Sequence, residues 1–108
     1  MTLTFYKYQG TGNDFVITSD LYELTSEQVI QLCDRKYGIG ADGLIVMKKG
    51  ETSDFDMMYY NADGSESFCG NGSRCTVKHA AFLGWISTEC TFNSNDGEHT
   101  AIIEGDEV

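Results

Sequence analysis

The sequence predicts one α+β domain spanning residues 1–108, with a largely antiparallel sheet, one peripheral helix and one buried helix. Short runs of alternating or apolar residues recur along the chain, as is typical of strands. Two other segments repeat their apolar residues at helical spacing. The 108 residues, 41% of them hydrophobic, are the size of a single domain and can bury a core without disulfides.

The N-terminal segment predicts two strands separated by a loop. Side chains in residues 2–8 alternate in character, which favours a strand with two different faces. Gln9–Asp14 is rich in residues that form turns, and we expect a loop there. Phe15–Thr18 is predicted to be a second, short strand.

A first helix is predicted to begin at Thr25. Thr25 and Gln28 have the spacing of a capping box, in which each side chain bonds the other residue's backbone N–H. Residues at helical spacing continue as far as Lys36 or Tyr37, and Gly38 suits the position that follows a helix. We expect this to be the peripheral helix.

The middle of the chain predicts two strands and the buried helix. Leu44–Met47 and Phe55–Tyr60 are apolar and aromatic strand candidates, followed by a polar loop, Asn61–Asn71. A helix is expected from about Gly72 to Leu83, ended by Gly84. It is apolar over much of its surface, so we expect the sheet to enclose it.

The C-terminal segment predicts a hairpin. Cys90–Phe92 and Thr100–Ile103 are strand candidates that flank Asn95-Asp96-Gly97, a combination that favours tight turns between antiparallel strands.

Composition excludes several classes of partner. The formal net charge is −10, and the seven Lys and Arg residues are scattered along the chain. Binding to nucleic acid or to an anionic membrane surface needs a basic patch, which this pattern does not supply. The N-terminus does not resemble a signal peptide, and no apolar run is long enough to span a membrane. We therefore expect a cytoplasmic protein.

The four cysteines are predicted to be free thiols in that reducing compartment. They contain no Cys-x-x-Cys pair, so we expect no structural zinc. We also predict no residue that binds another metal. Cys33, Cys75 and Cys90 fall at core positions of predicted helices or strands, where a cysteine is an ordinary small apolar residue.

Cys69 differs from the other three because Gly70, Asn71, Gly72 and the start of a predicted helix follow it. Backbone amides at a helix N-terminus stabilise a thiolate and lower its pKa from the usual value of about 8.5. The same amides can bind an anionic group of a ligand. This combination favours a proton-transfer or nucleophilic site.

Two other motifs resemble sites for a dinucleotide and for calcium, but the residues around them do not fit either site. Gly38–Gly43 matches the Gly-x-Gly-x-x-Gly pattern of dinucleotide sites, but it follows a helix and precedes a strand, the reverse of what that site requires. Asn61–Glu66 resembles part of a calcium loop, but Tyr59 and Gly70 would occupy the first and last ligand positions. No lysine stands in a cofactor-type motif, so pyridoxal phosphate is not indicated.

Four motifs together resemble the diaminopimelate epimerase family, in its order and spacing, over almost the whole chain. They are Gly10–Phe15 (GTGNDF), Gly38–Gly43 (GIGADG), Asn61–Glu66 (NADGSE) and Cys69–Gly72 (CGNG). The resemblance implies a cofactor-independent isomerase that interconverts LL- and meso-diaminopimelate, for lysine and peptidoglycan synthesis. It also implies two α/β halves facing each other across a cleft, each with a curved sheet wrapped around a central helix.

The resemblance assigns roles by position. Cys69 would be one of two acid–base thiols, and the amides of Gly70 and Asn71 would hold the substrate's α-carboxylate. Asn13 and Asn61 would hydrogen-bond the substrate near its distal end. Some family members carry glutamine where this chain has Gly43, so a contact from that position would be lost.

The resemblance also implies that a partner is missing. The family's C-terminal half, with the second cysteine, has no counterpart in these residues, so we expect this chain to be an N-terminal half that is inactive alone. The sequence does not decide whether the whole enzyme is a homodimer. Three alternative functions also remain: a proline or hydroxyproline racemase, a phenazine-type isomerase that does not use Cys69, and a non-catalytic domain that binds amino acids.

Overall fold

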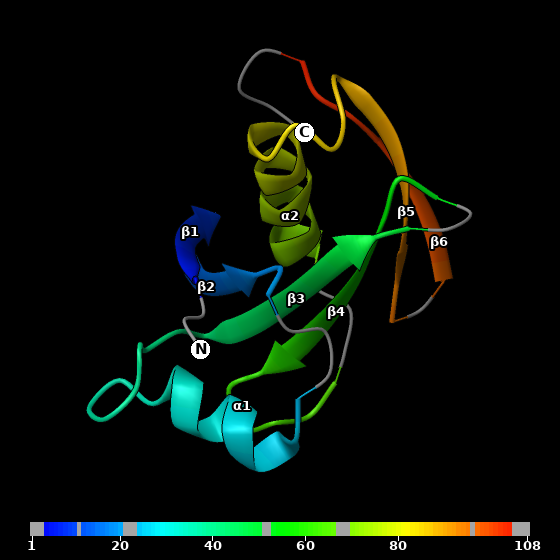
Figure 1. Ribbon diagram of the computed structural model, residues 1–108. Helices are drawn as coiled ribbons and strands as arrows, with labels where there is room; N and C mark the ends of the chain where they lie inside the picture. Colours follow the sequence, from blue (N-terminus) through cyan, green and yellow to red (C-terminus); the bar gives the residue numbers. More distant parts are fainter. Residues whose placement is uncertain are drawn as a thin grey trace.

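The computed structural model describes residues 4–10, 12–20, 24–50, 53–66, 70–95 and 97–104. It is an α+β fold, as predicted, in which single helices separate successive pairs of strands along the chain (Figure 1). In chain order the elements are β1 (Tyr6–Gly10), β2 (Asn13–Thr18), α1 (Ser26–Cys33), β3 (Gly43–Lys49), β4 (Phe55–Asn61), α2 (Gly70–Phe82), β5 (Glu89–Ser94) and β6 (Gly97–Ile102).

The six strands form one mixed sheet whose spatial order is the same as their order in the chain, β1-β2-β3-β4-β5-β6. The pairs β1–β2, β3–β4 and β5–β6 are antiparallel, whereas β2–β3 and β4–β5 are parallel. Antiparallel pairing therefore predominates, as predicted. Each parallel pair is joined by a helix, because parallel neighbours need a crossover connection: α1 joins β2 to β3, and α2 joins β4 to β5.

The two helices cover opposite faces of the sheet (Figure 1). Side chains alternate across a strand, so Ile45 and Met47 of β3 belong to the core against α2, while Leu44 and Val46 belong to the core that contains Val29 of α1. All four of these β3 side chains are fully buried. The strand is therefore covered on both sides, which explains why its sequence is a continuous apolar run instead of an alternating one.

The prediction that the sheet encloses the second helix is confirmed. β1 to β4 all contact α2, and Cys90 and Phe92 of β5 share its apolar core. Between residues 72 and 80 of α2, Arg74 and Lys78 are the two exposed side chains. Figure 1 shows the sheet curving around this helix from β1 and β2 to β5.

The start of α1 was predicted correctly, but its end was not. Thr25 is the N-cap: its hydroxyl oxygen accepts from the Gln28 amide at 3.2 Å, and Gln28 Oε1 accepts from the Thr25 amide at 2.9 Å. The helix stops at Cys33, because Asp34 takes an extended conformation. Its carboxylate then accepts from the backbone amides of Lys36 and Tyr37, a local turn that competes with the helix.

Gly84 ends α2, as predicted, and the end is a Schellman motif. Gly84 has φ +80°, a conformation that glycine adopts without strain. Its amide donates to the Ala81 carbonyl at 3.0 Å, and the Trp85 amide donates to the Ala80 carbonyl at 2.9 Å. The helix begins at Gly70, earlier than the predicted Gly72.

The predicted loop Gln9–Asp14 is instead most of a hairpin. β1 continues to Gly10 and β2 already begins at Asn13, with Gly10 paired to Asn13. Gly12 has φ +89°, a conformation that glycine adopts without strain where the chain reverses direction. The predicted C-terminal hairpin is confirmed by β5 and β6, with Ser94 paired to Gly97. Asp96 lies outside the described residues.

The burial of His79 in α2 predicts that the free energy of unfolding depends on pH. Its side chain is fully buried, Nδ1 lies 2.7 Å from the Tyr8 hydroxyl, and Nε2 has no hydrogen-bond partner among the described residues. Burial lowers the pKa of His79 below its usual 6.5. As the pH falls below about 6.5, the unfolded chain therefore binds a proton that the folded chain does not, and stability falls by at most about 1.4 kcal/mol per pH unit.

We expect His79→Phe to remove this slope between pH 7.5 and the onset of carboxylate titration near pH 4.5. The measurement is urea denaturation at a series of pH values. His99→Gln is the matched control, because the chain has two histidines, and it should keep the slope. An unchanged slope in His79→Phe would contradict the assignment.

Candidate functional site

Asn13 and Asn61, the two predicted substrate-binding asparagines, lie at the same end of the sheet. Asn13 opens β2, and Asn61 closes β4. The first residue of β3, Gly43, pairs with Asn61 on one side and with Phe15 of β2 on the other. Two segments far apart in the sequence are thus brought together by strand register.

The Asn61 side chain is held by the turn that follows it. Its Nδ2 donates to Ser65 Oγ at 2.9 Å, and Ser65 Oγ donates to Asp63 Oδ1 at 2.6 Å. A hydroxyl has one proton to donate, so the bond to Asp63 leaves Ser65 Oγ as the acceptor for Asn61. Hydrogen bonds to Ser65 also lower the pKa of Asp63. This loop is therefore a preformed turn.

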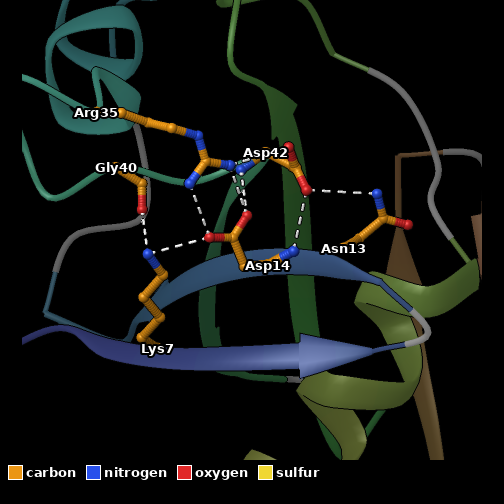
Figure 2. A network of polar contacts seen from close by, with 6 residues as sticks. All are labelled: Lys7, Asn13, Asp14, Arg35, Gly40 and Asp42. Atoms are coloured by element: carbon orange, nitrogen blue, oxygen red, sulfur yellow. Dashed lines mark hydrogen bonds and ion pairs between the residues drawn. The ribbon is translucent and has the colours of Figure 1, made fainter.

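A network of charged groups surrounds Asp14, the residue after Asn13 (Figure 2). Arg35 binds the Asp14 carboxylate with both arms of its guanidinium, Nη1 at 3.0 Å and Nη2 at 2.8 Å. Lys7 Nζ lies 3.1 Å from the same carboxylate and donates to the Gly40 carbonyl at 2.6 Å. Arg35 Nη2 also reaches Asp42 Oδ1, at 3.1 Å.

The network keeps its groups charged. Arg35 and Lys7 hold the pKa of the Asp14 carboxyl far below its usual range, with Arg35 the larger cause, and the Asp14 carboxylate in turn raises the pKa of Arg35. Asp14 is 9% exposed, whereas the cations reach it from more open positions. A buried carboxylate paired in this way stays ionised near neutral pH, so it holds the neighbouring segments together and does not act as an acid or a base.

Sequence reasoning did not identify this network. Asp14 lies in the Gly10–Phe15 motif and Asp42 in the Gly38–Gly43 motif, and their place in these motifs could have marked them as site residues. Lys7 and Arg35 have no motif of their own, and their contacts to Asp14 depend on the hairpin and on the turn after α1.

Gly43 lies against an aromatic ring. A Cβ at this position would fall 2.4 Å from the Tyr59 hydroxyl oxygen and 2.5 Å from its ring. Tyr59 is 5% exposed and packs edge-on against Phe15. Tyrosine therefore fills the space next to position 43, and the site has no side chain there.

Gly70 and Asn71 form the start of α2. Since β4 and β5 are parallel, α2 must return the chain from the end of β4, so it begins at the end of the sheet where Asn61 lies. The first backbone amides of a helix have no acceptor within the helix and attract anions. Cys69, the predicted acid–base residue, lies outside the described residues.

The three described cysteines, Cys33, Cys75 and Cys90, are free and buried, as predicted for core residues. Burial raises the pKa of the Cys33 and Cys90 thiols. Both are therefore poorly suited to act as thiolates near neutral pH.

Within the described part of the chain, no group of three or more His, Cys, Asp and Glu side chains could hold a metal ion. Neither described helix has the length and apolar character needed to cross a membrane.

Comparison with known proteins gives consistent results. The family model described as diaminopimelate epimerase matches residues 5–108. The chain is 44% identical to the diaminopimelate epimerase of Flavobacterium psychrophilum over 98% of its own length. It is 53% identical to that of Nostoc punctiforme over 77% of its length.

The chain covers 43% of the Flavobacterium protein and 32% of the Nostoc protein, so it spans less than half of these relatives. Among solved structures, a protein of the phenazine biosynthesis PhzF family from Enterococcus faecalis superposes with a TM-score of 0.72 at 16% identity. The superposition covers 98% of this chain and 42% of that one. At this identity the similarity supports the fold alone.

Proposed function

The chain belongs to the diaminopimelate epimerase family, and we propose that it is the N-terminal half of such an isomerase, folded as one domain. The family match over residues 5–108 carries this proposal. It is supported by the arrangement of the sheet, which gathers Asn13, Asn61 and the start of α2 at one end.

The chemistry explains why the site would use thiols and helix amides. The α-proton of an amino acid is a very weak acid, and without pyridoxal phosphate the developing carbanion needs electrostatic stabilisation. Amides of Gly70 and Asn71, directed at the substrate's α-carboxylate, would supply it. Cys69, with its pKa lowered beside them, would remove or return the α-proton.

Inversion needs a second acid–base group on the other face of the α-carbon. A single thiol tends to return the proton to the side from which it came. We propose that a C-terminal half, which the family has beyond the part that these residues span, supplies the second thiol and closes the cleft over the substrate. Asn13 and Asn61 would bind the substrate's distal end, and the enzyme would work in the cytoplasm, where its thiols stay reduced.

The test is complementation of two separately purified halves. The 108-residue chain alone should not epimerise LL-diaminopimelate, whereas addition of the C-terminal half should restore epimerisation, measured as α-deuterium incorporation from D2O with inversion. Thiol-dependent turnover by the chain alone would contradict the half-site proposal. Binding without turnover after complementation would favour a binding module, and turnover of proline instead of diaminopimelate would favour a racemase.

A further inference from the structure

Asp42 connects the segments that carry the two asparagines. Its carboxylate oxygen Oδ2 accepts from Asn13 Nδ2 at 3.4 Å and from the Asp14 amide at 3.1 Å. Its backbone carbonyl accepts from the amide of Ala62, the neighbour of Asn61, at 3.2 Å, and its amide donates to the Asp14 carbonyl at 3.0 Å. One residue of the α1–β3 connection thus bonds both the β2 start and the β4 end.

The Asp42 carboxylate is itself held in place. Arg35 Nη2 bridges Asp14 Oδ1 at 2.8 Å and Asp42 Oδ1 at 3.1 Å. Figure 2 shows Asp42 between Arg35 on one side and Asn13 on the other. Because Oδ1 faces the guanidinium, Oδ2 is directed at Asn13, and the paired charges resist rotation of the carboxylate.

This contact fixes the orientation of the Asn13 amide. A carboxylate accepts and does not donate, so the amide nitrogen must face Asp42 and the amide oxygen must lie on the other side of the side chain (Figure 2). The separation of 3.4 Å is long for a hydrogen bond, as is common before a ligand tightens a site. Asn61 is oriented in the same sense, with its nitrogen toward Ser65.

We propose that Asp42, held by Arg35, is a positioning residue that directs the Asn13 amide oxygen toward the substrate and thereby favours substrates with an ammonium group at the distal end. This inference rests on the proposed function, because it takes Asn13 to be a distal contact. An amide oxygen accepts from an ammonium group, whereas a flipped amide would present N–H groups that favour a carboxylate instead.

Asp56 provides a matched control. Its Oδ1 accepts from Asn93 Nδ2 at 3.0 Å, the same carboxylate–amide contact. Asp56 pairs with Lys48 near the start of β4, away from the end that carries Asn61. Removing this carboxylate removes a comparable contact without touching Asn13.

The experiment compares two substrates in a protein that carries both halves. These are diaminopimelate and 2-aminopimelate, which lacks the distal ammonium group. We expect Asp42→Ala and Arg35→Ala to lower the ratio of the two kcat/KM values about tenfold, the effect of losing one charge-assisted hydrogen bond. Asp42→Asn, which keeps an oxygen acceptor, should restore part of the ratio, and Asp56→Ala should leave it within about twofold. An equal loss on both substrates would show a merely structural role and overturn the proposal.

A second measurement separates this proposal from the proposed function. If the unchanged protein does not epimerise diaminopimelate, the proposed function fails, and the Asn13 orientation can still be tested by NMR of its side-chain amide. Asp42→Ala should shift the two Asn13 Nδ2 proton signals, whereas Asp56→Ala should not. Signals unchanged in Asp42→Ala would overturn the positioning role.

Discussion

Replacing Cys69 by alanine, in a protein that carries both halves, is expected to lower kcat/KM for diaminopimelate epimerisation by about 10²–10⁴-fold, the usual contribution of a positioned acid–base group. Alanine removes the thiol and is close to cysteine in size. The opposite thiol would still deprotonate one stereoisomer, but no group would protonate the other face. We therefore expect α-proton exchange with D2O to persist for one stereoisomer while inversion falls by that factor.

The stereoisomer that still exchanges would be the one that the opposite thiol deprotonates, so the other stereoisomer would be the one that Cys69 normally deprotonates. Cys90→Ala is the control, because Cys90 is a buried core thiol whose pKa is raised by burial, and it should keep the rate of inversion. Full inversion activity in Cys69→Ala would show that the acid–base assignment is wrong.

Replacing Phe15 by alanine is expected to cost about 3–5 kcal/mol of unfolding free energy, the range for deleting a buried aromatic ring. Phe15 is 0% exposed and packs edge-on against Tyr59, with ring centroids 5.9 Å apart. It pairs with Gly43 and belongs to the apolar core against α2, on the face of the sheet opposite Asp14, so the cavity would open in that core. Urea denaturation measures the effect.

Tyr37→Ala is the matched control for this prediction. The Tyr37 side chain is 84% exposed, and removing it should change stability by no more than about 0.5 kcal/mol. If Phe15→Ala cost no more than Tyr37→Ala, the placement of Phe15 in the core would be wrong.

Features with a local physical cause could be predicted from the sequence. The capping box at Thr25 and the glycine end of α2 depend on residues a few positions apart, which is why both predictions are confirmed. The strands β3 and β4 follow from their apolar runs. The enclosure of α2 follows from its apolar surface.

The wrong predictions occurred where another interaction overrides the local sequence pattern. Helical spacing continues past Cys33, but Asp34 bonds the backbone amides of Lys36 and Tyr37 and ends α1 there. The turn-rich stretch Gln9–Asp14 was predicted to be a loop, but cross-strand pairing extends β1 to Gly10 and starts β2 at Asn13. Pairing is a tertiary contribution that composition does not report.

The sequence by itself determined the α+β class, the family, and which residues are candidates for the chemistry, Cys69 and the two asparagines among them. Those conclusions depend on residue types and short spacings. Only the tertiary structure decided that Lys7 and Arg35 converge on Asp14, and that Asp42 joins the segments of Asn13 and Asn61. These contacts join strands and turns that are distant in the chain, and their geometry depends on strand register and on the unexpected end of α1.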